Sequence, residues 1–153
     1  MRYSLPGPFY SANGIRTLRL DPNISDPILE HARGVGVKTP GLVVQYTGLY
    51  YVYSGIHYKP STKHDLENCE TQTWLHYVIR LSPNIPDNTG VLLQTIYSAC
   101  GMCQNNSGTA FTGGVFHLKN DDFIQVEASK PSMVDYSHVS TYIGLMMLTS
   151  GGG

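Results

Sequence analysis

The stretch Leu49–Tyr58 constrains the fold more than any other, because both of its faces are apolar or aromatic. Successive side chains of an extended strand point to opposite faces. One face therefore carries Leu49, Tyr51, Tyr53 and His57, and the other carries Tyr50, Val52, Ile56 and Tyr58. A strand with one face in water alternates apolar and polar side chains. Both faces must therefore be covered, one by a second sheet and the other by more of the same chain or by a partner subunit.

The strand predicted at Thr141–Leu148 repeats this pattern. It places Tyr142, Met146 and Leu148 on one face, and Ile143, Leu145 and Met147 on the other. Two strands without a solvent face favour a partner subunit. Charged residues make up only 14% of the chain and the formal net charge is -1, so little like-charge repulsion opposes self-association. The same charge balance gives no basis for binding nucleic acid or an anionic membrane.

The composition predicts one all-β domain. A chain of 153 residues has the length of a single domain. Strong helix formers are scarce, whereas eleven Tyr, sixteen Gly and nine Pro favour short strands between turns. We expect eight to ten strands in an antiparallel jelly-roll sandwich. The predicted strands are Arg16–Leu20, two short pieces within Pro27–Lys38, Leu42–Tyr46, Leu49–Tyr58, Trp74–Leu81, Val91–Ser98, Gly113–Leu118, Phe123–Ala128 and Thr141–Leu148.

The two ends of the chain are expected to lie outside the packed domain. We expect residues 1–15 to be a poorly ordered N-terminal segment, residues 16–148 to form the jelly roll, and residues 149–153 to be a flexible tail. Met1–Leu5 lacks the apolar middle of a signal peptide, and no apolar run approaches the roughly 18 residues of a transmembrane helix. If the protein is extracellular, the segment that exports it lies outside this chain.

No pattern in the chain indicates catalysis or metal binding. Cys100 and Cys103 form a C-x-x-C pair, but no second pair stands at zinc spacing and the βαβ context of a redox motif is missing. The six His are scattered, and there is no G-x-S-x-G. Asp121 and Asp122 lie in a predicted hairpin turn, where Asp is favoured. We therefore expect no enzyme activity, no cofactor, no metal and no small-molecule substrate.

Cysteine and asparagine residues carry two patterns that would matter if the protein is extracellular. The three cysteines, Cys69, Cys100 and Cys103, would give one disulfide and one leftover thiol in an oxidising compartment. Asn23 and Asn105 each begin an N-glycosylation acceptor sequence, and both fall in predicted loops.

Three sequence blocks occur in an order and spacing that are typical of one family. They are Gly41–Val44 followed by Thr47–Ser54, then Gly113–Leu118 with its turn and Asp122, and finally Tyr142–Leu148. The first resembles the central hairpin, the second the later hairpin and the third the closing strand of the tumour necrosis factor superfamily ligands. Together they cover about residues 41 to 148.

The resemblance implies a jelly roll that forms a homotrimer and binds cysteine-rich receptor ectodomains. It implies an extracellular protein, either secreted or shed as the ectodomain of a single-pass type II membrane protein. It also implies a disulfide between Cys69 and Cys100, which leaves Cys103 free or available to another chain. The positions expected to face the threefold axis are Tyr51, Tyr53, Phe111, Tyr142 and Met146.

The resemblance further implies that the receptor contacts two loops, Ser82–Gly90 and Ser129–Ser140. In the first loop Ile85 would stand where many members carry a Tyr anchor, with Pro86 and Asp87 beside it. In the second loop the expected contact residues are Lys130, Asp135, Tyr136 and His138.

Two other function classes remain open from the sequence. A complement-type globular head is a related jelly roll that acts as a recognition module on a collagen stalk, although no Gly-X-Y repeat is present in the chain. An enzyme on a β-sandwich would require His and Asp residues that cluster in space, which the sequence alone does not show.

Overall fold

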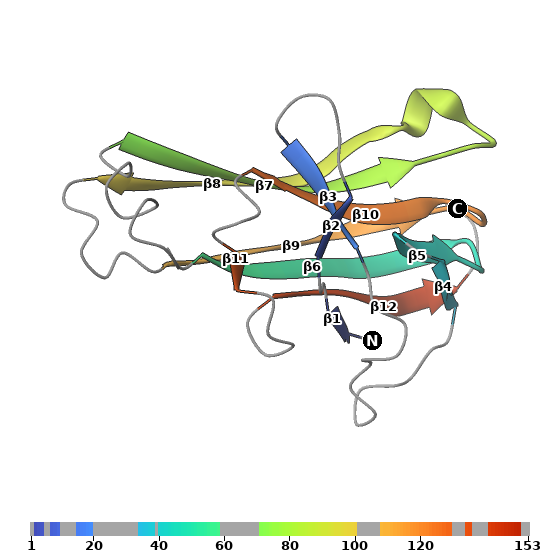
Figure 1. Cartoon of the computed structure of the whole chain (residues 1–153). Coiled ribbons are helices and arrows are strands. Elements are labelled where there is room, and N and C mark those ends of the chain that lie inside the picture. The colour runs from blue at the N-terminus through green and yellow to red at the C-terminus, as the bar shows by residue number, and fades with distance from the viewer. Residues whose placement is uncertain are drawn as a thin grey trace.

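The computed structural model describes residues 2–4, 7–9, 15–19, 34–38, 40–58, 71–100, 108–129, 134–135 and 141–150. Within these ranges the chain forms antiparallel strands and one short 3-10 helix, arranged as two facing layers (Figure 1). The elements are β1 (Arg2–Ser4), β2 (Gly7–Phe9), β3 (Ile15–Arg19), β4 (Val35–Lys38), β5 (Gly41–Val44), β6 (Gly48–Tyr58), β7 (Thr71–Leu81), η1 (Pro86–Asn88), β8 (Gly90–Cys100), β9 (Gly108–Leu118), β10 (Phe123–Ser129), β11 (Val134–Asp135) and β12 (Tyr142–Ser150). The all-β prediction is confirmed.

The first sheet is built around β6. Strand β9 pairs with β6 from Gly48 to Tyr58 on one side. On the other side β12 pairs with Gly48–Gly55, and β11 pairs with His57 and Tyr58. Strand β1 extends the sheet beyond β12. The strand with two apolar faces is therefore flanked along both edges, which leaves its two faces as the surfaces that need covering.

The second sheet is built around β10. Strand β7 pairs with one side of β10, and β3 and β5 pair with the other. Strand β8 lies beyond β7, β4 beyond β5, and β2 beyond β3. This sheet covers the inner face of the first sheet and supplies half of the core.

The core lies between the two sheets and is rich in aromatic side chains. The Trp74 ring stacks on Tyr58 with ring centroids 4.7 Å apart, and the Tyr58 hydroxyl donates a hydrogen bond to the Leu75 carbonyl oxygen at 3.1 Å. Buried aromatic rings of this size contribute much of the apolar area that stabilises a domain. The other large fully buried side chains are Tyr50, Leu42, Ile56, Leu118, Ile124, Ile143 and Leu145.

The observed strands extend beyond several predicted ones. Strand β7 begins at Thr71 and β9 at Gly108, before the predicted strands at Trp74–Leu81 and Gly113–Leu118 begin. In each case a long neighbouring strand supplies continuous ladder partners, β8 for β7 and β6 for β9. Cross-strand pairing thus overrides the weak local β-propensity of Gly and polar residues. The short strand β11 and the helix η1 also lie within predicted loops.

Strands are also found at both ends of the chain. Within residues 1–15, β1 pairs with β12, and β2 pairs with β3. At the other end β12 continues to Ser150, and Thr149 and Ser150 pair with Leu49 and Gly48. The sheets therefore include parts of the segments that we expected to lie outside the domain.

The turn between β9 and β10 is held by Asp122, which is only 4% exposed. One carboxylate oxygen accepts a hydrogen bond from the Ser82 hydroxyl at 2.7 Å, and the other accepts from the Lys119 backbone N–H at 2.9 Å. Asp121 adopts a positive φ of 72°, a conformation that Asp and Asn tolerate better than most residues. The paired acids are structural elements of this turn, as the sequence predicted.

Replacing Asp122 with Asn should destabilise the fold, because an amide group keeps one acceptor oxygen but presents N–H groups where the second acceptor stood. The expected loss in the free energy of unfolding is about 1–3 kcal/mol, measured by urea denaturation at a fixed protein concentration. Asp121→Asn is the matched control and should change the free energy by less than about 0.5 kcal/mol. Equal losses in the two variants would contradict the bracing role of Asp122.

Candidate subunit interface and receptor-binding loop

The outer face of the first sheet carries a continuous apolar and aromatic surface. Tyr51 and Tyr53 lie at its centre on β6. The strand register places Val115 and Met146 on either side of Tyr51, and Phe111 and Tyr142 on either side of Gly55. We call this surface the aromatic face, defined by Tyr51, Tyr53, Phe111, Val115, Tyr142 and Met146. Phe111 is 54% exposed, Val115 53% and Met146 51%.

The tyrosine rings of the aromatic face are ordered against one another. Tyr51 and Tyr53 stack with ring centroids 5.4 Å apart, and Tyr142 meets Tyr53 edge-on at 6.2 Å. Glycines make room for these rings. A Cβ at Gly55 would lie 2.7 Å from Cζ of Tyr142, and a Cβ at Gly113 would lie 2.6 Å from the Tyr51 hydroxyl. The rings can therefore lie close to the backbone and present a broad surface.

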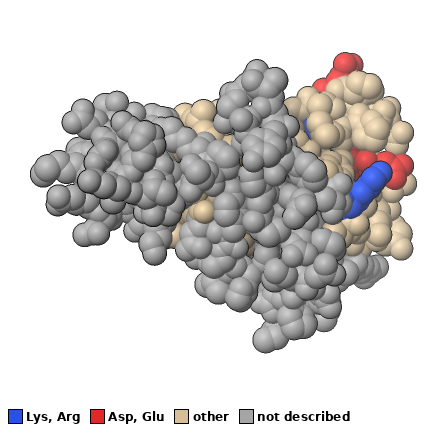
Figure 2. All heavy atoms as spheres, in the orientation of Figure 1, with Lys and Arg blue, Asp and Glu red and all other residues tan. Residues whose placement is uncertain are grey.

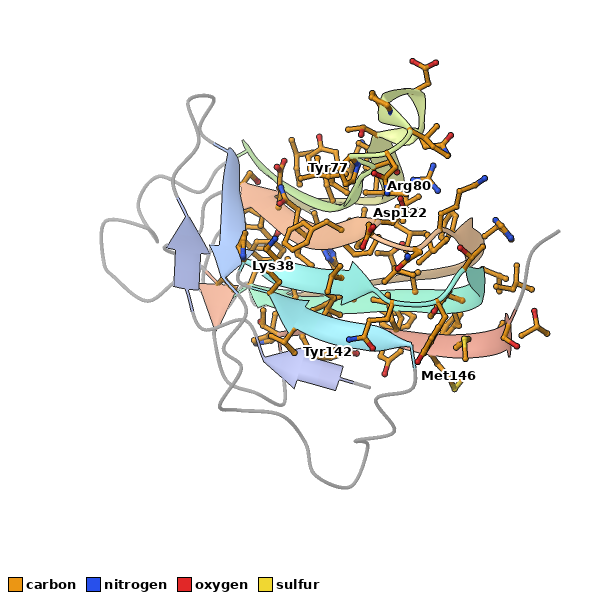
Figure 3. The ribbon with its side chains drawn as sticks, turned by 90° about the vertical axis from the view of Figure 1, so that its right-hand side faces the viewer. Lys38, Tyr77, Arg80, Asp122, Tyr142 and Met146 are labelled. Carbon is orange, nitrogen blue, oxygen red and sulfur yellow. The ribbon has the colours of Figure 1, made fainter. Side chains whose placement is uncertain are left out.

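All five residues expected at the threefold axis lie on the aromatic face. Figure 3 shows two of them, Tyr142 and Met146, on the opposite side of the sandwich from Tyr77 and Arg80. Val115 belongs to the same face but was not among the expected residues. Counting alternate residues on from Phe111 and Gly113 would have identified it.

The inner face of β6 carries a polar pair among its apolar side chains. Ser54 and His76 are both fully buried, and His76 Nε2 lies 2.9 Å from the Ser54 hydroxyl oxygen. That hydroxyl donates a hydrogen bond to the Tyr142 carbonyl oxygen at 2.9 Å, so it accepts one from His76 Nε2–H. His76 Nδ1 has no hydrogen-bond partner, and burial lowers the pKa of the ring to about 4.

This pair does not form a hydrolytic site. A catalytic serine must be open to substrate, and its histidine is oriented by a third group. Ser54 is buried, its proton is held by a carbonyl oxygen, and no group orients His76 through Nδ1. In the part of the chain that the structure describes, no three His, Cys, Asp or Glu residues are grouped to hold a metal ion.

The loop between β7 and β8 is braced internally. The Arg80 Nε–H donates to the Asn88 carbonyl oxygen at 2.7 Å, and the Ser82 backbone N–H donates to the Thr89 hydroxyl at 2.9 Å. Backbone bonds from Asn88 to Ile85 and from Thr89 to Pro86 close the turn of η1. The loop therefore presents Ile85, which is 37% exposed, from a fixed conformation.

An open groove of about 570 Å³ adjoins the same loop. Val43, Leu81 and Phe123 give it an apolar lining, and Lys38 and Asp121 contribute opposite charges. In the view of Figure 2 the charged side chains of the described residues gather at this end of the molecule, whereas uncharged residues occupy the rest of the visible described surface. A partner could here combine apolar contact with a few specific polar bonds.

The comparisons with known proteins agree with this geometry. The chain matches the TNF (Tumour Necrosis Factor) family over residues 26–148. It belongs to the TNF family. Members of this family are cytokine ligands and not enzymes. No match was found among curated protein sequences.

Two crystal structures of murine APRIL are similar to this TNF-family chain. The structure determined at pH 5.0 has a TM-score of 0.68 and 21% sequence identity, and the match covers 96% of this chain and 98% of the other. The structure determined at pH 8.0 has a TM-score of 0.69 and 19% identity, with 96% of each chain covered. These similarities establish the fold.

Several residues expected at functional sites of this TNF-family chain lie outside the described residues. They are Lys130, Tyr136, His138, Cys69, Asn23 and Asn105. The backbone of Asp135 lies in β11, where it pairs with His57. The backbone of Cys100 ends β8, where it pairs with Thr71. No helix among the described residues has the length and hydropathy needed to cross a membrane.

The burial of His76 predicts a stability that falls in acid. Its pKa is 6.5 in an exposed chain and about 4 in the folded protein, so the unfolded chain takes up the proton first as the pH drops. The free energy of unfolding is therefore fully retained above about pH 6.5 and falls toward pH 4, by up to about 3 kcal/mol. Urea denaturation across this range measures the loss. His76→Gln should show a flatter profile, and an equally steep one would contradict the assignment.

Proposed function

We propose that this chain is a homotrimeric ligand that binds and clusters cysteine-rich ectodomains of the TNF-receptor family and thereby triggers signalling. The observation that carries the proposal is the aromatic face, which spans β6, β9 and β12 on the side of the first sheet away from the core. The ligand would act outside the cell, secreted or shed as the ectodomain of a single-pass type II membrane protein. The family match favours this function over a complement-type globular head.

A threefold assembly would cover the aromatic face. A large exposed apolar patch on a soluble domain marks a surface that meets a partner. Phe111, Val115 and Met146 are each about half exposed in the single chain, and the low net charge of -1 opposes association only weakly. Copies of one chain that meet head-to-tail close into a ring when the rotation between neighbours permits it, and a threefold ring brings three aromatic faces together.

Replacing Tyr53 with Ser should weaken the trimer. A buried aromatic side chain hides about 150–250 Å², which at ~25 cal/mol/Å² contributes up to about 4–6 kcal/mol before offsetting terms. The concentration of half-dissociation, measured by sedimentation velocity, should rise by at least about tenfold. Tyr77→Ser is the matched control, because Tyr77 lies half-buried on the outer side of the second sheet. If both variants dissociate alike, the aromatic face is not the interface.

The receptor would contact the β7–β8 loop through Ile85, Pro86 and Asp87. All three are exposed, and the hydrogen bonds of Arg80 and Ser82 hold the loop in one conformation. A preorganised loop loses little conformational entropy on binding. The adjoining groove gives a receptor side chain an apolar place to insert beside Ile85. Lys130, Asp135, Tyr136 and His138 are the proposed contacts from the second loop.

Ile85→Ala should weaken receptor binding while the trimer stays intact. Truncating a central apolar anchor costs about 2 kcal/mol or more, which corresponds to roughly 30-fold in affinity. Surface plasmon resonance against a panel of TNF-receptor-family ectodomains measures the change. Val91→Ala provides an exposed aliphatic control on the neighbouring strand. Retention of affinity within about twofold by a trimeric Ile85→Ala protein would remove Ile85 as the anchor.

A disulfide between Cys69 and Cys100 is proposed to tie the segment before β7 to the end of β8. Cys100 pairs with Thr71 in the β7–β8 ladder, and Cys69 precedes Thr71 by two residues, a span of at most about 7 Å. Asn23 and Asn105 are the proposed glycosylation sites. Peptide mapping without reduction should recover the Cys69–Cys100 pair with Cys103 unpaired. A Cys69–Cys103 peptide would overturn the pairing.

A further inference from the structure

We propose that the groove beside the β7–β8 loop receives a receptor segment in which an apolar side chain stands next to a carboxylate. The apolar side chain would lie on the floor of the groove, and the carboxylate would pair with the Lys38 ammonium. This inference rests on the proposed receptor binding and names the chemistry of the receptor segment that meets this part of the chain. It adds Lys38 to the contact residues that the sequence implies.

The floor of the groove is a row of apolar side chains that crosses three neighbouring strands. Phe123 on β10 pairs with Leu81 on β7 and with Val43 on β5, and all three line the groove. They lie on the face of the second sheet that points away from the core, because the next residue along β10, Ile124, is fully buried. Leu81 is 38% exposed, so the single chain leaves the floor open to an apolar group.

Two segments that line the groove, the β7–β8 loop and the turn between β9 and β10, are joined to each other by side-chain hydrogen bonds. The Asn84 side-chain amide donates to the Asp121 carboxylate at 3.3 Å. The Ser82 hydroxyl donates to the buried Asp122 carboxylate at 2.7 Å. The groove is therefore formed before a partner arrives, and filling it costs little conformational entropy.

The charges at the groove favour an anionic group on the partner. Lys38 and Asp121 both line it, but the Asp121 carboxylate already accepts the hydrogen bond from Asn84. Within the part of the chain that the structure describes, the Lys38 ammonium forms no ion pair. A carboxylate complements a free ammonium, and the bond between them strengthens where an apolar neighbour excludes water.

The Lys38 ammonium adjoins the apolar floor on the side of Val43. Strand β4 pairs with β5, so that Gly36 stands opposite Val43 and Lys38 opposite Gly41. Gly36 continues the row of the floor without adding a side chain, and Lys38 follows two residues later on the same face. One short receptor segment can therefore reach the floor and the cation together. The aromatic face belongs to the other sheet, so burying it does not by itself cover this groove.

The first experiment uses surface plasmon resonance with those TNF-receptor-family ectodomains that bind the parent protein. Lys38→Gln should weaken binding by at least about fivefold, because it leaves the receptor carboxylate in the groove without a cation. Lys38→Arg keeps the charge and should retain affinity within about twofold. Lys119→Gln is the matched control, because Lys119 is an exposed lysine on the neighbouring turn that does not line the groove. Its affinity should stay within about twofold of the parent.

The floor is tested with the same ectodomains. Leu81→Ala should weaken binding by at least about fivefold, because it removes apolar area that the receptor side chain would cover. Val91→Ala removes an exposed aliphatic side chain outside the groove and should leave the affinity within about twofold. Equal losses in these two variants would contradict the role of the floor.

A second experiment tests the groove without a receptor. Hydrocinnamate carries an aromatic ring and a carboxylate, and hydrocinnamamide differs from it in carrying an uncharged amide. In amide NMR titrations of the parent protein, hydrocinnamate should shift the signals of Lys38, Leu81 and Phe123. It should bind at least about threefold more tightly than hydrocinnamamide. Lys38→Gln should bind the two compounds alike.

Equal binding of the two compounds by the parent protein, or shifts confined to other parts of the chain, would overturn the inference. A receptor that binds the parent and Lys38→Gln alike would overturn it too, while leaving the proposed function in place. A parent trimer that binds no ectodomain of the family would contradict the proposed function itself, and the inference with it.

Discussion

The structure depends on one constraint, which is that β6 has no face suited to water. Its inner side chains, Tyr50, Val52, Ile56 and Tyr58, are fully buried against the second sheet. Its outer side chains join those of β9 and β12 in the aromatic face. Folding of one chain covers the first set and leaves the second partly exposed. Burying the second set by association is the same hydrophobic process carried from the core to the subunit interface.

The glycines and the polar pair adapt β6 to these two tasks. Gly55 and Gly113 leave space for Tyr142 and Tyr51 to lie against the sheet, so the outer surface is broad and closely packed before any partner arrives. On the inner side, His76 Nε2 and the Ser54 hydroxyl are joined by a hydrogen bond within an apolar core, whereas His76 Nδ1 has no partner. Such a bond adds little net stability but favours one alignment of the two sheets, because breaking it would leave two more buried polar atoms without a partner.

The division of each strand's side chains between two faces could be predicted from the sequence, whereas the contacts between the two stacked sheets could not. Counting alternate residues placed Tyr50 and Val52 on one face of the strand and Tyr51 on the other. Burial confirms that the two faces differ, because Tyr50 and Val52 are fully buried and Tyr51 is not. The early start of β9 was missed because Gly and Thr residues there have weak strand preference, and only the long partner β6 makes the pairing favourable. The contact between Ser54 and His76 depends on how the sheets stack, which no local pattern records.

The central claim is that copies of this chain cover the aromatic face of one another. Sedimentation equilibrium of the parent protein at micromolar concentration and neutral pH tests it most directly, because the measured mass does not depend on molecular shape. The account predicts a single species with three times the 16.9 kDa mass of one chain. A species with the mass of one chain under these conditions would contradict it.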